Sequence, residues 1–88
     1  MLLAATPAGS SRDAVMRYVQ RERFRVMDAS PVTSWTDRFV RERGGASYLK
    51  VYLGHYRSVF RVDVIAYYIF DQSGRLKEIV IIKDADAV

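Results

Sequence analysis

The spacing of the hydrophobic residues changes at Ser47, and this change limits the folds open to the chain. Before Ser47, apolar residues recur every three or four positions, as they do along one side of a helix. After it, Leu49, Val51 and Leu53 alternate with Tyr or Lys, which is the period of a half-buried strand. The order of the two periods predicts helices first and an antiparallel sheet second.

The first helix is predicted from Ser11 to about Arg23. Ser10 and Asp13 have the spacing of a capping box, in which each side chain accepts a hydrogen bond from the other residue's backbone N–H. The apolar residues that follow share one side of the helix because they lie three and four positions apart: Ala14, Val15, Tyr18 and Val19.

A second, shorter helix is predicted from about Ser34 to Arg43. Pro31 cannot lie inside a helix, so the two helices are separate. Gly44 and Gly45 follow the last turn, and glycine readily adopts the left-handed conformation that ends a helix.

Three strands are predicted after the helices, from Ser47 to about Gly54, from about Phe60 to Phe70 and from Leu76 to about Lys83. Gly54 would end or bulge the first of them. The segment Asp71–Arg75 joins the last two and has the sequence of a type I turn followed by a left-handed glycine. Counting back from this turn places Ala66 opposite Val80.

The same register places Asp63 opposite Lys83, which would be a favourable pair of charges across the strands. The predicted fold is therefore an α+β domain in two layers, with two N-terminal helices followed by a three-stranded antiparallel meander. The 88 residues are expected to form a single domain, with residues 1–9 as a flexible N-terminus. The first helix is expected to pack on one face of the sheet: Phe60, Val62, Val64, Ala66, Tyr68 and Phe70, with Leu49, Val51, Leu53, Val80 and Ile82.

Catalytic and metal chemistry find little support in the sequence. The chain has no cysteine, which excludes disulfides, thiolate zinc sites and a cysteine nucleophile. His55 is the single histidine, and no nucleophile or ligand motif accompanies it. No enzyme activity, catalytic residue, metal or cofactor is therefore expected.

The formal net charge of +4 is concentrated in arginines near the first helix. Arg17, Arg21 and Arg25, together with Arg57 in a strand connection, are the candidates for contacts with an anion or a nucleic acid. The alternative is a solvated helix face that keeps a small domain soluble.

The sheet face opposite the first helix is the predicted functional surface. It would be apolar at its centre and charged at its edge, as protein interfaces are. We expect it to bind a protein partner or a second copy of the chain. In one alternative, the second helix covers this face through Trp35 and Phe39. In another, tyrosines on the sheet and the basic helix bind nucleic acid. The residues of the predicted surface are Tyr48, Tyr52, Ile65, Tyr67, Ile69, Ile79 and Ile81.

Two segments of the chain resemble small bacterial envelope proteins. One is Pro7–Ser11 followed by Val15 and Tyr18, and the other runs from Tyr68 through the glycine turn to Lys83. Together they cover residues 7–24 and 60–83 and are similar to the outer-membrane assembly lipoproteins of the SmpA/OmlA type and to the repeats of the β-lactamase-inhibitor protein. The resemblance implies a non-enzymatic domain that binds a protein partner through its sheet. The chain departs from the lipoproteins in having no cysteine to carry a lipid.

The longest uninterrupted apolar run, residues 64–70, is far shorter than the ~20 residues of a membrane-spanning helix. As written, the sequence predicts a cytoplasmic protein. A leader removed from a longer precursor would instead make it periplasmic.

Overall fold

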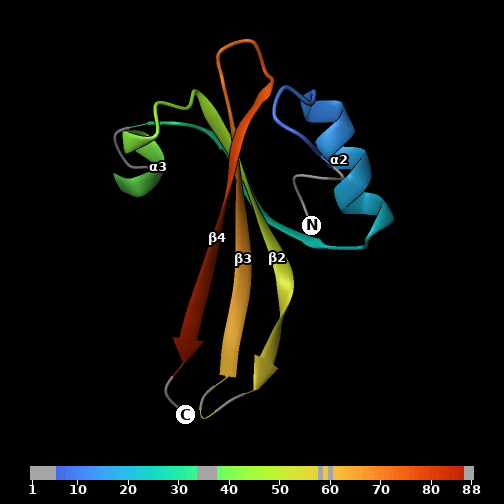
Figure 1. Cartoon of the computed structure of the whole chain (residues 1–88), viewed down its shortest axis with the longest axis vertical. Coiled ribbons are helices and arrows are strands. Elements are labelled where there is room, and N and C mark those ends of the chain that lie inside the picture. The colour runs from blue at the N-terminus through green and yellow to red at the C-terminus, as the bar shows by residue number, and fades with distance from the viewer. Residues whose placement is uncertain (1–5, 34–37, 58, 60, 87–88) are drawn as a thin grey trace.

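The described residues form one antiparallel sheet of four strands in the order β1-β2-β3-β4 (Figure 1). The structure, a computed structural model, describes residues 6–33, 38–57, 59 and 61–86. Its elements are α2 (Arg12–Arg21), β1 (Arg25–Pro31), α3 (Arg38–Glu42), β2 (Ser47–Arg57), β3 (Arg61–Phe70) and β4 (Leu76–Asp86).

The predicted order of two helices followed by a three-stranded meander is wrong, because β1 lies between the helices and pairs with β2. Hydrophobic periodicity does not identify β1, because it is an edge strand whose residues are almost all exposed. Its apolar and polar residues therefore do not alternate. Pro31 stands at its end, where an edge strand tolerates a missing backbone donor.

The first helix is confirmed, but both of its ends differ from the prediction. Its N-cap is Ser11, whose Oγ accepts from the Ala14 N–H at 3.1 Å. The Ser10 hydroxyl donates instead to the Pro7 carbonyl, so the predicted capping box with Asp13 is wrong.

The C-terminal end of α2 is a Schellman motif without glycine. Arg23 has a left-handed φ of 59°, and its N–H donates to the Gln20 carbonyl. The Phe24 N–H donates to the Val19 carbonyl, and both residues belong to the same apolar cluster. Because the residue in the left-handed position is arginine, the sequence carries no signal for this helix end.

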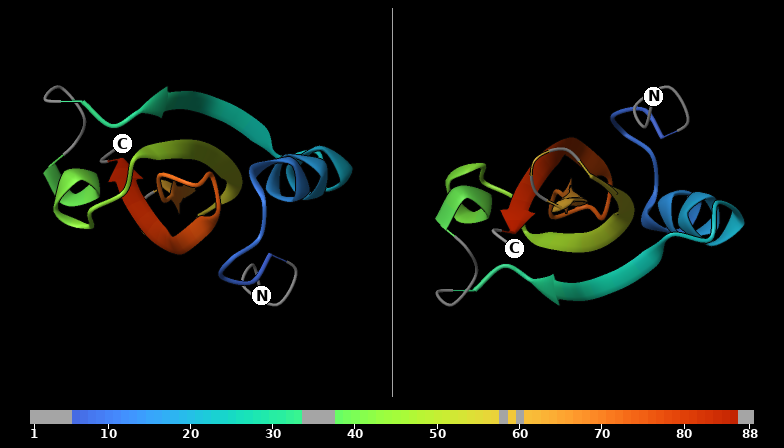
Figure 2. Two further views of the ribbon diagram at one scale, coloured as in Figure 1. Left: turned by 90° about the horizontal axis from the view of Figure 1, so that it is seen from above. Right: turned by 90° about the horizontal axis from the view of Figure 1, so that it is seen from below.

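The two helices cover opposite faces of the sheet, so the predicted two-layer arrangement is also wrong (Figure 2). Val15 and Val19 of α2 are fully buried against an apolar cluster on one face of the sheet, which consists of Leu49, Val51, Ala66, Tyr68, Phe70 and Leu76. Val40 of α3 is fully buried on the other face against Ile65, Tyr67 and Ile69, with Val32, Tyr48, Tyr52, Val80 and Ile82 around them. We call these the α2 face and the α3 face.

The turn between β3 and β4 is confirmed. Gly74 has a φ of 79°, and the Asp71 N–H donates to the Arg75 carbonyl at 2.9 Å. The Asp71 carboxylate also accepts from the backbone N–H groups of Ser73 and Arg75. These bonds explain why the local sequence is enough to predict this turn.

The register beyond the turn is shifted by one residue from the prediction. Phe70 faces Leu76, but Ile69 faces Glu78, so Lys77 is an extra residue on β4. Ala66 consequently faces Ile81 and not Val80, and the predicted pair of Asp63 with Lys83 does not form.

This bulge exchanges the two faces of β4, because side chains alternate along a strand. Ile79 joins the cluster under α2, while Val80 and Ile82 join the cluster under α3. The predicted positions of these three residues are therefore reversed.

The N-terminal segment is tied to the start of β4. The Gly9 N–H donates to the Leu76 carbonyl at 2.7 Å, and the Leu76 N–H donates to the Ser10 carbonyl at 2.7 Å. The Arg75 guanidinium also donates to the Gly9 carbonyl at 3.1 Å. Residues 9 and 10 are thus hydrogen-bonded to the start of β4.

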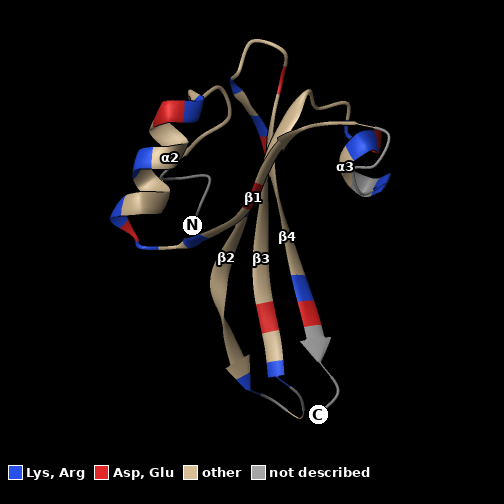
Figure 3. Ribbon diagram, turned by 180° about the vertical axis from the view of Figure 1, so that it is seen from behind, with Lys and Arg blue, Asp and Glu red and all other residues tan. Residues whose placement is uncertain are grey.

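Both helices lie at the same end of the sheet, so the other end extends beyond them (Figures 1 and 3). We call residues 53–57 of β2, 61–64 of β3 and 81–86 of β4 the projecting half. The remaining parts of these strands, between α2 and α3, form the covered half.

Candidate functional site

The projecting half of the sheet has one polar face and one face that is mainly apolar. Because neighbouring residues point to opposite sides, the polar residues of the α3 face alternate with apolar residues of the α2 face. On the α3 face the residues are Tyr52, just before the projecting half, with His55, Arg61, Asp63 and Asp84. On the α2 face they are Leu53, Tyr56, Val62, Val64 and Ile81, which we call the apolar patch; the exposed Lys83 lies on the same face, opposite Val64.

A hollow of about 390 Å³ opens on the α3 face, and we call it the β1–β4 groove. The sheet is strongly curled, so that its two edge strands both contribute to this hollow (Figure 2). Its lining comes from all four strands: Arg25 and Met27 from β1, Lys50 and Tyr52 from β2, Arg61, Asp63 and Ile65 from β3, and Asp84 from β4.

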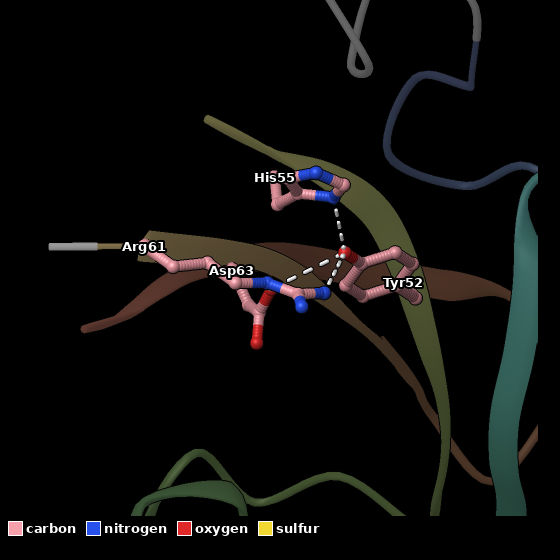
Figure 4. A network of polar contacts seen from close by, with 4 residues as sticks. All are labelled: Tyr52, His55, Arg61 and Asp63. Carbon is pink, nitrogen blue, oxygen red and sulfur yellow. Dashed lines mark hydrogen bonds and ion pairs between the residues drawn. The ribbon is translucent and has the colours of Figure 1, made fainter. Parts of the chain in front are cut away.

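The Tyr52 hydroxyl is the centre of a polar network on this face (Figure 4). It lies 3.0 Å from His55 Nδ1 and 3.2 Å from Asp63 Oδ1, and it accepts from an Arg61 Nη at 3.4 Å. Arg61 Nε also donates to Asp63 Oδ1 at 3.1 Å. One proton arrangement satisfies every contact: His55 Nδ1–H and Arg61 donate to the Tyr52 oxygen, and the Tyr52 O–H donates to Asp63.

The Tyr52 hydroxyl and the Asp63 carboxylate raise the pKa of Arg61. These contacts also occupy the Asp63 oxygen that faces the network. His55, Asp63 and Asp84 stand opposite one another on β2, β3 and β4. In the part of the chain that the structure describes, however, no three such residues come together as metal ligands.

A second polar contact joins β1 to β2. The Tyr48 hydroxyl donates to Asp28 Oδ2 at 2.7 Å, and Asp28 Oδ1 accepts from the Ala29 N–H and the Ser30 hydroxyl. The hydrogen bonds from Tyr48 and Ser30 lower the pKa of Asp28, and the same carboxylate raises the pKa of Tyr48. Both oxygens of Asp28 are therefore engaged.

The residues of the predicted interaction surface do not form one exposed face. Ile65, Tyr67 and Ile69 are buried, because α3 covers them through Val40. Tyr48 and Tyr52 are half-buried around them and use their hydroxyls in the contacts described above. Ile79 and Ile81 lie on the opposite face, as a result of the bulge at Lys77.

The alternative in which the second helix covers this face agrees with the position of α3. The two side chains through which it was expected to do so, those of Trp35 and Phe39, lie outside the described residues. Val40 makes the contact among the residues that are described.

The four candidate arginines lie in three separate places. Arg17 and Arg21 line a surface hollow on α2, where the Arg21 guanidinium lies 5.5 Å from the centre of the Tyr18 ring. Arg25 lines the β1–β4 groove, on the other face of the sheet. Arg57 stands opposite Arg61 at the end of the projecting half.

The apolar patch was missed by sequence reasoning, which expected the first helix to cover Val62 and Val64. The helix reaches only the covered half, so both valines are half-exposed. The patch also includes Tyr56, which is 45% exposed, and Ile81, which is 44% exposed. Val59, in the turn beyond the patch, is 83% exposed. A helix of ten residues spans about 15 Å, less than half the length of strands of ten and eleven residues, and this is the one signal that could have revealed the patch.

Comparison with known proteins gives no match: no family model matches the chain, and no match is found among the curated proteins or the solved structures. The similarity to SmpA/OmlA-type lipoproteins therefore remains an expectation from short motifs. No helix among the described residues has the length and apolar character needed to cross a membrane.

Proposed function

We propose that the chain is a protein-interaction domain and that its partner, another protein or a second copy of the chain, covers the apolar patch. The observation that carries this proposal is the contrast within the projecting half. Its α3 face ends in polar and charged residues suited to water, while its α2 face, apart from Lys83, continues the apolar surface that α2 buries elsewhere. A contiguous apolar surface with a polar surround is typical of a protein interface.

Binding of nucleic acid, the alternative, finds less support. Stacking of bases needs accessible aromatic rings next to basic side chains. Tyr67 is only 5% exposed, and the basic residues of α2 lie on the face opposite the tyrosines Tyr48 and Tyr52. These two groups of residues therefore do not combine into one surface.

The proposal is tested with two variants of exposed patch residues, Tyr56→Lys and Ile81→Lys, and with His55→Lys as a matched control. His55 is also exposed and lies on β2 next to Tyr56, but its backbone position belongs to the polar face. Sedimentation velocity over a range of concentrations measures self-association. Quantitative affinity capture from the source cells measures binding of a different protein.

We expect either a dimer or one captured protein that is lost in both patch variants and retained in His55→Lys. A wild-type chain that stays monomeric and captures nothing that depends on Tyr56 or Ile81 would contradict the proposal. Circular dichroism of each variant establishes that the fold is intact.

A further inference from the structure

We infer that the β1–β4 groove is a binding site for a small organic anion, whose carboxylate or phosphate group lies between Arg25 and Lys50. This site is on the face opposite the apolar patch, so it does not depend on the proposed protein interface. The inference starts from the charges of the groove and from which of them are already paired.

The two basic side chains on the β1–β2 side of the groove have no ion-pair partner among the described residues. The Lys50 ammonium lies 5.6 Å from the centre of the Tyr67 ring, a contact that orients the cation without neutralising it. Arg25 stands opposite Tyr52 at the start of β1 and is exposed. The side chains of Arg25 and Lys50 thus bring two positive charges to the β1–β2 side of one hollow, and the Asp28 carboxylate opposite Lys50 offsets part of the second charge.

The carboxylates nearest to these charges direct their oxygens to other groups, although they keep their negative charge. Asp28, which stands opposite Lys50 on β1, accepts hydrogen bonds at both of its oxygens. Asp63 is paired with Arg61 and accepts from Tyr52. On the β1–β2 side of the groove an anion would therefore contact two cations, whereas the carboxylates that line the groove, Asp63 and Asp84, lie on β3 and β4.

Asp84 determines where in the groove the anionic group can lie. It lines the groove from β4 and stands opposite Asp63 on β3. Repulsion from this carboxylate disfavours an anion on the β3–β4 side. The same arrangement favours the β1–β2 side, where Arg25 and Lys50 are.

The groove also has room and apolar surface for an organic body. Its volume of about 390 Å³ falls at the small end of the range of ligand sites. Met27, which is 46% exposed, and Ile65 provide apolar walls on β1 and β3. These walls favour a compact anion with a short apolar part over a bare inorganic ion.

The test is an NMR titration of the uniformly ¹⁵N-labelled protein with sodium hexanoate and, separately, with inorganic phosphate, both at constant ionic strength. The variants are Arg25→Gln and Lys50→Gln, and Arg17→Gln on α2 is the control with the same change of charge. Lys50→Arg keeps the positive charge in the groove. Because the wild type itself reports which amides shift, the test does not depend on the stability of any variant.

On addition of hexanoate, phosphate or both, we expect saturable shifts of the amide signals that are confined to residues 25–28, 50–52 and 61–65. The probe that binds more tightly shows whether the groove prefers a carboxylate or a phosphate group. Loss of one charge-assisted contact should weaken binding roughly tenfold in Arg25→Gln and Lys50→Gln. Arg17→Gln should bind as the wild type does, and Lys50→Arg within about threefold of it. The inference is overturned if neither probe gives saturable shifts at these residues, or if Arg17→Gln weakens binding as much as the groove variants do.

Discussion

The covered and projecting halves of the sheet are built from the same three strands but differ in what surrounds them. In the covered half, helices lie on both faces, and residues 65–70 of β3 are all buried. In the projecting half, residues 61–64 of the same strand are exposed or half-exposed. The comparison predicts that the free energy of unfolding depends mainly on side chains of the covered half.

The largest difference between the halves is expected for truncation of an apolar side chain. Phe70→Ala should lower the free energy of unfolding by about 3–5 kcal/mol, because the ring is fully buried under α2. Val62→Ala, on the same face of β3 but in the projecting half, should cost less than about 1 kcal/mol. Urea denaturation measures both values. Similar losses in the two variants would mean that the halves do not differ in stability.

The buried Tyr68 hydroxyl makes the covered half sensitive to alkaline pH. Burial raises the pKa of Tyr68 to about 12, and the neighbouring Thr6 side chain offsets part of this rise. The folded state therefore holds the phenolic proton more tightly than the unfolded state does. The resulting stability is complete below pH 10 and is lost as the pH rises from about 10 to 12.

By pH 11.5 this loss should reach about 2 kcal/mol in the wild type, measured by urea denaturation at a series of pH values. Tyr68→Phe should remove this part of the pH dependence, because phenylalanine has no proton to lose. If the two proteins lose stability in parallel above pH 10, Tyr68 is not the group responsible.

The smallest expected effect concerns the end of α2, the helix that protects the covered half. Arg23 adopts a left-handed conformation that costs a non-glycine residue energy. Arg23→Gly should therefore raise the free energy of unfolding by about 0.5–1 kcal/mol, detectable as a higher thermal midpoint. Arg21→Gly, inside the helix, should lower it. An unchanged or lower midpoint in Arg23→Gly would show that the arginine side chain compensates for its strained backbone.

Parts of the fold that depend on local sequence were predictable. The periodicity of α2 and the alternation in β2 and β3 identified these elements, and the Asp71–Arg75 turn is determined by its own hydrogen bonds. The second helix and its glycine end were also found, although the described helix is shorter than predicted.

The parts that depend on partners distant in sequence were not predictable. The bulge at Lys77 follows no glycine or proline, yet it shifts every later pair of β3 and β4. The burial of Ile65, Tyr67 and Ile69 depends on where α3 packs, which alternation within a strand does not reveal. The β1–β4 groove needs residues from all four strands, including the one strand that sequence reasoning missed.

The bonds between the N-terminal segment and the start of β4 have a consequence for synthesis of the chain on the ribosome. Gly9 and Arg75, which they join, are 66 residues apart, and α2 also packs mainly on strands that follow it by more than 25 residues. At roughly 5–20 residues per second, the apolar side of α2 leaves the ribosome several seconds before the strands that bury it. During this interval Val15 and Val19 remain exposed, so the nascent chain presents a site for chaperones that the finished domain conceals.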